Sequence, residues 1–374
     1  MDTDTLAASA PDIAGTLEKT HLRLGFVALS DAAPLVAAKV LEFGHRHGLT
    51  LELSRQPSWA AVRDKLLSGE LDAAHALYGL VYGVQLGIGG PRADMAVLMV
   101  LNRNGQAITL SSKLAQALDD TGNLKAALAT LGRTPVFAQT FPTGTHAMWL
   151  YYWLAAQGVH PLEDIESVVI PPPRMVDALA RETLDGFCAG EPWHALAEAN
   201  GAGQTVTSTS EIWPGHPEKV LACQREFVTR YPNTARALVR TMLEACRWVD
   251  APSHRKEITP WLAKADALDL PEALIAPRLV GHAGGVRFAQ PPLPVAFFDG
   301  GAVNYPRVSD GRWFLAQYRR WHLLRDGDSA GENDAAIAAA INQTALYREA
   351  AALADVPVPP ENRTEVFCDG ATWA

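Results

Sequence analysis

The sequence lacks the patterns by which several large protein classes are recognised. Its four cysteines, Cys188, Cys223, Cys246 and Cys368, form no Cys-x-x-Cys pair, which argues against zinc and thioredoxin-type sites. The 32 basic residues form no block and the formal net charge is -9, so we expect no direct contact with nucleic acid. No run approaches the roughly 20 apolar residues of a membrane-spanning helix, so we also expect no membrane span.

Catalytic motifs are missing as well. The chain has no Gly-x-Ser-x-Gly, no P-loop and no His-Glu-x-x-His. The glycines at 87–90 precede Pro91 and open no helix, so they are not a dinucleotide-binding fingerprint. His45, His47 and His75 are scattered and lack the partners of a metal cluster. We therefore predict a protein that is not an enzyme and that uses no cofactor and no metal.

The first residues are polar and rich in alanine. They show no basic region followed by an apolar core, and no cysteine in the first forty residues that could carry a lipid anchor. On this pattern we expect a cytoplasmic protein in which residues 1–20 are a disordered lead-in.

Strand and helix candidates alternate along the chain. The strand candidates lie at residues 22–29, 51–54, 71–77, 135–138, 167–170 and 184–189. The helix candidates include residues 35–43, 59–68, 175–182, 271–280 and 333–353. Such alternation predicts βαβ units and a parallel sheet.

The length of 374 residues exceeds the size at which one core stops growing, about 250–300 residues. We predict an α/β fold of two lobes with a ligand cleft between them. Lobe 1 would contain residues 21–103 and 223–374, and lobe 2 residues 104–222. Ligands of open α/β sheets bind beyond the carboxyl ends of strands, and Trp59, Gln106, His146 and Lys219 each follow a predicted strand or flank a crossover.

The segment Phe141-Pro-Thr-Gly-Thr-His146, followed by an apolar stretch, predicts a turn that opens a helix with Thr145 near its cap. The free N–H groups and the dipole of such a terminus favour a small anion. A histidine in the first turn is unusual, because a positive charge there opposes the dipole. In an acidic protein the anion must be held by local donors, because bulk attraction does not supply it.

Six motifs follow one another in a fixed order. They are SW-x-x-x-RD (58–64), NGQAI (104–108), FP-x-GTH-x-x-W (141–149), PPP-x-MV (171–176), DGFC-x-GEPW (185–193) and HPEK (216–219). Together, over about residues 22–370, the chain resembles the nitrate and bicarbonate solute-binding proteins of ABC transporters. This resemblance implies a two-lobed periplasmic-binding-protein-like (type II) fold. Because no export signal is visible, the chain is most similar to the cytoplasmic branch, the NasS-type nitrate/nitrite sensors.

The resemblance also implies a ligand site and a partner. The anion contacts of the family match Trp59, Gln106, Gly144, Thr145, His146 and Lys219, although Thr143 stands where we expect a second glycine. Taken singly, Trp59 would be a packing residue, Lys219 a solvated lysine and Glu191 a turn or a contact between lobes. The partner of a NasS-type sensor is an ANTAR-type RNA-binding antiterminator (NasT-like), which is held inactive until ligand arrives.

Nitrate is planar, carries one delocalised charge and donates no hydrogen bond. A lysine ammonium, an indole N–H, a glutamine NH₂ and an imidazole N–H suit it. Bicarbonate also needs an acceptor for its O–H, and Gln106 supplies the only one among these candidates. We therefore predict a cytoplasmic nitrate/nitrite sensor in which ligand closes the lobes and releases the antiterminator. The alternative is a solute receptor of a nitrate or bicarbonate ABC transporter, and a third reading is an enzyme on the same fold.

Overall fold

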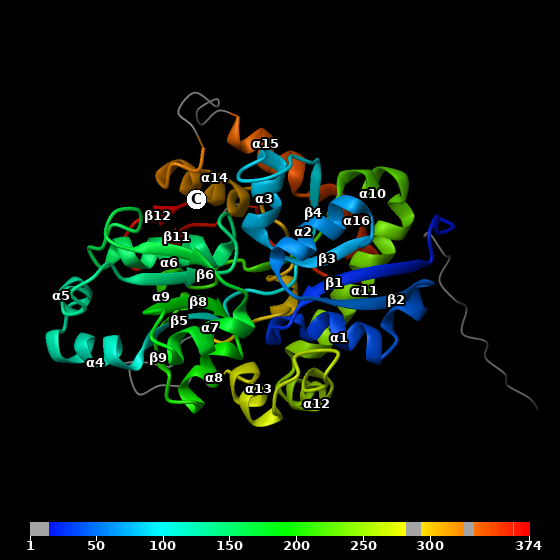
Figure 1. The fold of residues 1–374 in the computed structure, drawn as a ribbon. Coiled ribbons are helices and arrows are strands. Elements are labelled where there is room, and N and C mark those ends of the chain that lie inside the picture. Colours follow the sequence, from blue (N-terminus) through cyan, green and yellow to red (C-terminus); the bar gives the residue numbers. More distant parts are fainter. Residues whose placement is uncertain (1–14, 282–292, 325–332, 362) are drawn as a thin grey trace, which may run out of the picture.

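The computed structural model describes residues 15–281, 293–324, 333–361 and 363–374. Within these ranges the strands form two five-stranded sheets and a short hairpin (Figure 1). The first sheet, in spatial order, contains β2 (Thr50–Gln56), β1 (His21–Val27), β3 (Ala73–Leu77), β10 (Lys219–Gln224) and β4 (Met95–Val100). The second contains β7 (Glu166–Val169), β6 (Val136–Gln139), β8 (Gly186–Gly190), β5 (Gln106–Ser111) and β9 (Gly203–Ser208). The hairpin consists of β11 (Glu365–Val366) and β12 (Thr372–Trp373).

Both sheets follow the same plan. β1 is parallel to β2 and β3, and β6 is parallel to β7 and β8. β10 is antiparallel to β3 and β4, and β5 is antiparallel to β8 and β9. The prediction of a parallel sheet is therefore wrong for β5 and β10. These two strands enter from a crossover between the sheets, so no βαβ connection fixes their direction.

The crossovers, residues 101–105 and 209–218, separate the two sheets along the chain. β10 pairs within the first sheet from Lys219 onward, a few residues before the boundary that we expected after residue 222. Our assignment of residues to lobes otherwise stays a prediction. Of the predicted lead-in, residues 1–14 lie outside the described residues, whereas the Glu18 carboxylate accepts a hydrogen bond from the Thr234 backbone N–H at 2.9 Å.

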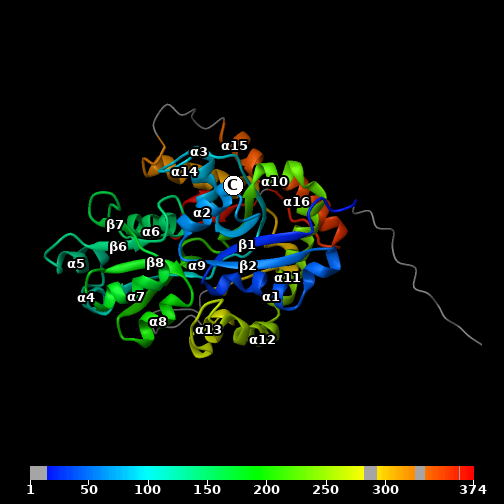
Figure 2. The ribbon, with the colours of Figure 1, turned by 45° about the vertical axis from the view of Figure 1, so that its right-hand side comes forward.

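Helices cover both sheets, as Figures 1 and 2 show. Those following the strands of the first sheet are α1 (Ala33–Val40), α2 (Trp59–Ser68), α3 (Tyr78–Leu86), α10 (Arg225–Arg230), α11 (Pro232–Asp250), α12 (Pro252–Leu262) and α13 (Glu272–Leu279). Those of the second are α4 (Ser112–Thr121), α5 (Leu124–Ala129), α6 (Thr145–Ala156), α7 (Pro172–Ala180), α8 (Trp193–Ala199) and α9 (Thr209–Ile212). Late in the chain come α14 (Val308–Arg320), α15 (Asp334–Ile341) and α16 (Thr344–Leu353). The short 3-10 helices are η1 (Ser30–Ala32), η2 (Phe43–His47) and η3 (Asp299–Gly301).

Helix α2 has the predicted bounds, because its end signals are local. The Ser58 hydroxyl accepts a hydrogen bond from the Ala61 N–H, and Gly69 ends the helix at φ +75°. The single helix predicted for residues 333–353 is wrong, because Asn342 leaves helical geometry between α15 and α16. Its side chain is buried among Tyr78, Tyr82 and the Arg307 carbonyl, which hold it by hydrogen bonds.

The late helix α14 packs on the second half of the molecule. Its Trp313 is buried, with its ring 4.7 Å from that of Trp149 on α6 and 5.2 Å from that of Trp213. The C-terminal hairpin extends this contact, since Phe367 lies 5.1 Å from Trp213. The late residues Trp313 and Phe367 therefore contact residues of the second half.

Candidate functional site

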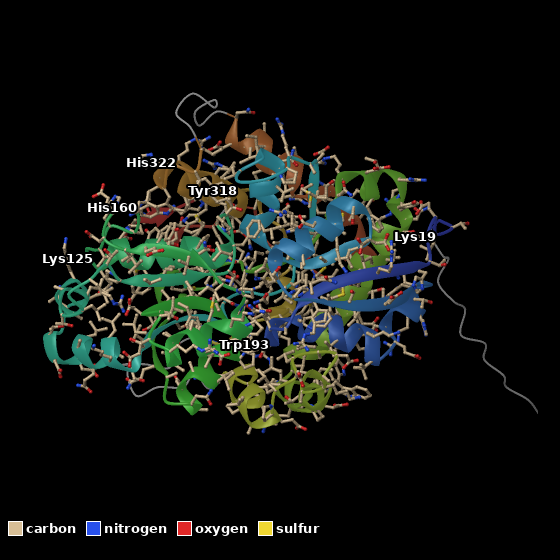
Figure 3. The ribbon with its side chains drawn as sticks, in the orientation of Figure 1. Lys19, Lys125, His160, Trp193, Tyr318 and His322 are labelled. Atoms are coloured by element: carbon tan, nitrogen blue, oxygen red, sulfur yellow. The ribbon has the colours of Figure 1, made fainter. Side chains whose placement is uncertain are left out.

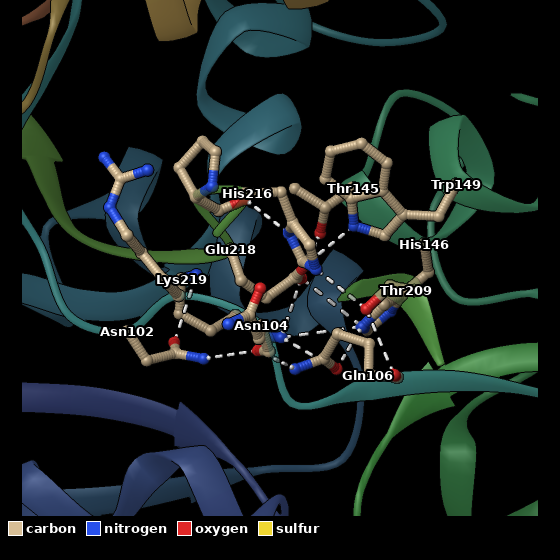
Figure 4. A network of polar contacts seen from close by, with 12 residues as sticks. Asn102, Asn104, Gln106, Thr145, His146, Trp149, Thr209, His216, Glu218 and Lys219 are labelled. Carbon is tan, nitrogen blue, oxygen red and sulfur yellow. Dashed lines mark hydrogen bonds and ion pairs between the residues drawn. The ribbon is translucent and has the colours of Figure 1, made fainter. Parts of the chain in front are cut away.

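The two crossovers run antiparallel between the sheets and carry the site. The Leu101 N–H donates to the Lys219 carbonyl at 2.7 Å, and the Asn104 N–H donates to the His216 carbonyl at 3.1 Å. Because of this pairing, Gln106 and Lys219, the first residues of β5 and β10, come together at the junction of the two lobes. Figure 4 shows the polar side chains that converge there.

Lys219 lies between two carboxylates and is completely buried. Its Nζ is 2.9 Å from Asp31 Oδ2 and 2.9 Å from Glu218 Oε1. Burial alone would lower the pKa of Lys219, but the two carboxylates outweigh burial and raise it. Burial would likewise raise the pKa of Asp31, but Lys219 and His75 hold it well below its usual range. Lys219 is therefore a buried counter-ion and not a solvated lysine.

Asp31 also sets the orientation of Gln106. The Gln106 amide donates from Nε2 to Asp31 Oδ2 at 3.0 Å, so its oxygen points the other way. That oxygen is 2.9 Å from His146 Nε2 and 3.4 Å from Lys219 Nζ. The NH₂ group expected to contact the anion is thus already donated to Asp31. Gln106 offers an acceptor toward Lys219 and His146 instead.

His146 is neutral in this arrangement. Its Nδ1 is 2.6 Å from the Thr140 hydroxyl, which donates to it, and its Nε2–H donates to Gln106. Burial, followed by the charge of Lys219, lowers the pKa of His146 well below its ordinary value. The expected conflict between a histidine cation and the dipole of α6 therefore does not arise.

The turn before α6 has the predicted form. Gly144 is the N-cap residue, and the first bond of the helix runs from the Met148 N–H to the Gly144 carbonyl at 3.2 Å. The N–H groups of residues 145–147 consequently have no partner within the helix. The Thr145 hydroxyl does not cap the helix but donates to Glu218. Thr143 does not adopt a positive φ, so this turn does not require a second glycine there.

Trp59 opens α2 and lies beside Lys219. Its ring centre is 5.8 Å from Lys219 Nζ and 5.7 Å from the centre of the His75 ring. The indole is completely buried, and within the described part of the chain its N–H has no hydrogen-bond partner. A buried donor without a partner costs about 1–3 kcal/mol, so this N–H is available to an incoming oxygen.

The structure thus brings Gln106, His146 and Lys219 into direct contact. Trp59 joins them over the lysine, and Thr145 joins them through Glu218. The assignment of these residues to ligand binding stays a prediction.

Among the residues of the network that sequence reasoning missed are Asp31, His75 and Glu218. Glu218 lies in the HPEK motif beside Lys219, and that motif was the only signal. Asp31 was part of an unremarkable turn, and His75 belongs to a strand that we read as ordinary. The two carboxylates also remove our argument against bicarbonate, because acceptors for its O–H are present near the lysine.

A second set of contacts joins the lobes beside this network. The Ser30 N–H donates to the Glu191 carbonyl at 2.8 Å, and the Trp193 indole donates to the Ala28 carbonyl at 2.9 Å. Figure 3 labels Trp193 at this boundary. Arg278 of α13 lies 3.4 Å from Glu191 Oε1 and 2.6 Å from Glu198 Oε2.

Two properties of Glu191 follow from these contacts. Burial raises its pKa to about 7, although Arg278 opposes this shift. Glu191 forms a contact between the lobes, which is one of the two structural roles considered for it from the sequence. A cavity of about 40 Å³ borders Glu191, Arg278 and Gln106.

The described residues contain neither a cluster of metal ligands nor a membrane-spanning helix. Across residues 15–281, 293–324, 333–361 and 363–374, no three His, Cys, Asp or Glu side chains gather in a way that could hold a metal ion. In the same part of the chain, no helix combines the length and the apolar character needed to cross a bilayer.

Two α/β lobes of one strand plan, linked by two crossovers with polar groups buried between them, define the class of two-lobed periplasmic-type solute-binding proteins. Residues 15–263 match the NMT1-like family, and this chain belongs to that family. The crystal structure of the periplasmic nitrate-binding protein NrtA from Synechocystis PCC 6803 superimposes with a TM-score of 0.86 and 34% identity, over 95% of this chain and 96% of that one.

Sequence comparison agrees with the structural match. The nitrate/nitrite binding protein NrtA of Synechocystis sp. is 35% identical over 95% of this chain and 82% of its own length. The bicarbonate-binding protein CmpA of Synechococcus sp. is 29% identical over 98% and 86%. The nitrate import ATP-binding protein NrtC of Synechocystis sp. is 38% identical over 82% of this chain, which spans only 47% of that longer relative.

Proposed function

We propose that this protein binds nitrate or nitrite between its lobes as the solute receptor of an ABC-type import system. One observation carries the proposal: a buried ammonium, Lys219, lies beside a buried indole N–H without a partner, on a chain similar to nitrate/nitrite-binding NrtA. Charge-assisted hydrogen bonds in a dry cleft, each worth about 1.5–3 kcal/mol, support micromolar affinity after association costs.

The relatives described above are components of nitrate and bicarbonate transport. They support the receptor better than the cytoplasmic sensor that we first predicted from the sequence. Control of an antiterminator and a cytoplasmic location stay separate proposals. Co-purification from cells grown with and without nitrate, combined with fractionation, tests both. A sensor would bind its partner and the anion with reciprocal effects on affinity.

Trp59→Phe tests the ligand site, since it keeps an aromatic ring but removes the indole N–H and part of the ring system. Titration calorimetry of the wild-type protein should show micromolar affinity for nitrate or nitrite, and bicarbonate should be titrated in parallel. Trp59→Phe should weaken binding about 10- to 100-fold through the lost hydrogen bond to a charged group, and a buried tryptophan elsewhere controls for the smaller ring.

Trp321→Phe is the matched control, because Trp321 is also buried, its N–H likewise has no hydrogen-bond partner among the described residues, and it follows α14, away from the site. It should bind like the wild type. Equal affinity of Trp59→Phe and the wild type would show that the anion does not contact this indole. A wild-type protein that binds bicarbonate but neither nitrate nor nitrite would refute the proposed ligand.

A further inference from the structure

His75 is a buried titratable group of the site with one ring nitrogen that has no hydrogen-bond partner among the described residues. Its Nε2 is 2.9 Å from Asp31 Oδ1, and its ring packs against Trp59 at 5.7 Å between centres. Within the described residues its other nitrogen, Nδ1, has no hydrogen-bond partner, just as the Trp59 N–H has none. Both side chains are completely buried. An open imidazole nitrogen and an open indole N–H therefore belong to neighbouring rings beside Lys219.

The charges of the ligand-free site do not favour the binding of an anion. Asp31 accepts hydrogen bonds from His75, Gln106 and Lys219. Glu218 accepts them from Thr145, Trp149 and Lys219. Three donors to each carboxylate favour its ionised form, and the pKa of Asp31 is lowered accordingly, whereas burial outweighs the donors of Glu218 and raises its pKa.

One ammonium faces two carboxylates, and with both carboxylates ionised the cluster is negative by one charge. An incoming oxyanion would add another negative charge in a buried place, which is unfavourable without a compensating positive charge.

The other buried groups are poorly suited to supply that positive charge. His146 has both ring nitrogens in hydrogen bonds and lies in the first turn of α6, where the dipole opposes a cation. His216 also has both nitrogens engaged, with the Pro217 carbonyl at 3.1 Å and the Thr209 hydroxyl at 2.7 Å. Only His75, among the histidines of this network, combines an open nitrogen with a carboxylate to hold its other N–H.

We propose that His75 is a further anion-binding residue, which takes up one proton from solvent when the oxyanion binds. Its Nε2–H stays on Asp31, and the new Nδ1–H donates to the anion beside the Trp59 indole. The inference rests on the proposed function, because it concerns the same ligand site. Neutral imidazole, one proton and the anion give imidazolium and bound anion, so the charge of the complex balances.

The surroundings of His75 agree with this assignment. The charged groups that act on it are Asp31 from η1 and Lys219 from β10, and Lys219 is shared with Glu218. Trp59 of helix α2, which packs on the His75 ring, is uncharged. On β1, the Arg23 guanidinium donates to the Gly69 carbonyl, away from His75.

These groups also give the direction of the pH effect. In the ligand-free protein, burial first and Lys219 second lower the pKa of His75, whereas Asp31 raises it. A bound anion adds negative charge near His75 and partly offsets the positive charge of Lys219. The pKa of His75 therefore rises in the complex. A proton is taken up on binding when the pH lies between the pKa values of His75 in the free and bound protein. In that pH range the affinity for the anion falls by up to tenfold for each unit by which the pH rises.

Calorimetry of the full chain with nitrate, in buffers of different ionisation heat between pH 6 and 8, measures the proton uptake. The wild type should take up about one proton per nitrate. His75→Gln should take up none and should bind more weakly at pH 6. His194→Gln is the matched control, because His194 is also completely buried but has both ring nitrogens bonded, to Thr109 at 2.7 Å and to the Ala189 carbonyl at 2.8 Å. It should keep the wild-type proton uptake.

The outcomes separate this inference from the proposed function. Nitrate binding without proton uptake overturns the role of His75 and leaves the receptor intact. Uptake that survives His75→Gln but disappears in Glu218→Gln moves the proton to Glu218 and also overturns it. A wild-type protein that binds none of the three anions fails the proposed function itself. Should His75→Gln not fold, nitrogen-15 histidine spectra of the wild type decide, since nitrate must convert one neutral ring to imidazolium.

Discussion

Replacing Lys219 by methionine should destabilise the protein through the two carboxylates that remain. Methionine keeps much of the length and apolar volume of the lysine stem but carries no charge. Asp31 and Glu218 would then face each other in a buried place without a counter-ion. Removing one partner of a buried ion pair costs about 3–5 kcal/mol, which is a large share of the roughly 5–15 kcal/mol by which domains are stable.

The destabilisation should depend on pH. Without the ammonium, the folded-state pKa of Asp31 rises above its unfolded value, and that of Glu218, which burial already raises, rises further. The penalty is then complete above the folded pKa and is relieved as the pH falls through it, because protonation removes the buried charge. The difference in the free energy of unfolding between Lys219→Met and the wild type should therefore be larger at pH 8 than at pH 5.

Urea denaturation at pH 5, 6.5 and 8, followed by tryptophan fluorescence, measures this difference. Adding Asp31→Asn to Lys219→Met should recover part of the stability, with a coupling above about 1 kcal/mol. Lys125→Met is the matched control, because the side chain of Lys125 is 67% exposed; it should change stability by less than about 0.5 kcal/mol. A Lys219→Met variant that loses under about 1 kcal/mol at both pH values would contradict the counter-ion role of Lys219.

Three other substitutions test separate parts of the structure by the same denaturation assay. The pKa of Glu191 is about 7 in the folded protein against an ordinary value of 4.5, so its contribution to the free energy of unfolding falls as the pH rises from 4.5 to 7. Glu191→Gln should remove this pH dependence, and a pH dependence equal to that of the wild type would contradict the raised pKa. Trp313→Ala should cost about 3–5 kcal/mol, since it empties the contact with Trp149, and a cost under 1 kcal/mol would show that this packing matters little. Gly83→Ala should cost about 1–3 kcal/mol, because its Cβ would lie 2.1 Å from the Thr143 hydroxyl oxygen; an unchanged free energy of unfolding would mean that the turn before α6 moves freely.

The parts of the fold that the sequence predicted are those with local signals. Helix α2 has a serine cap and a glycine end, and the turn before α6 is set by Gly144 and Thr145 within a few residues. The strands β4, β5, β9 and β10 were missed. β4, β5 and β10 are buried runs without the alternation that marks a half-buried strand, β9 is mostly polar, and the partners of β4 and β9 lie far away along the chain. Strand direction after a crossover is likewise a property of the assembled sheet.

The candidate site was predicted as a set of donors, and the structure shows why that was incomplete. Motifs record which residues recur together but not which of them satisfy one another. Lys219 and Gln106 have donors of the expected kind, yet both already donate to Asp31. A turn residue such as Asp31 can be recognised as a counter-ion only when the fold brings it against β10. The charge balance of the site was therefore outside the reach of motif reasoning.

This self-pairing decides how the binding energy of an anion must be counted. When an oxyanion bonds to Lys219, the ammonium weakens its contacts with Asp31 and Glu218. The net binding free energy is therefore only the difference between the new contact and the contacts that are weakened. The Trp59 N–H has no partner among the described residues and has already lost its hydrogen bond to water through burial. A hydrogen bond from it to the anion therefore contributes its full free energy to binding. The one hydrogen bond that the Trp59 indole can donate should consequently contribute more to affinity than a bond of Lys219, although the lysine carries the charge. Under the proposed function, affinity should therefore follow from what the ligand-free protein leaves unsatisfied, more than from the number of donors that can reach the ligand.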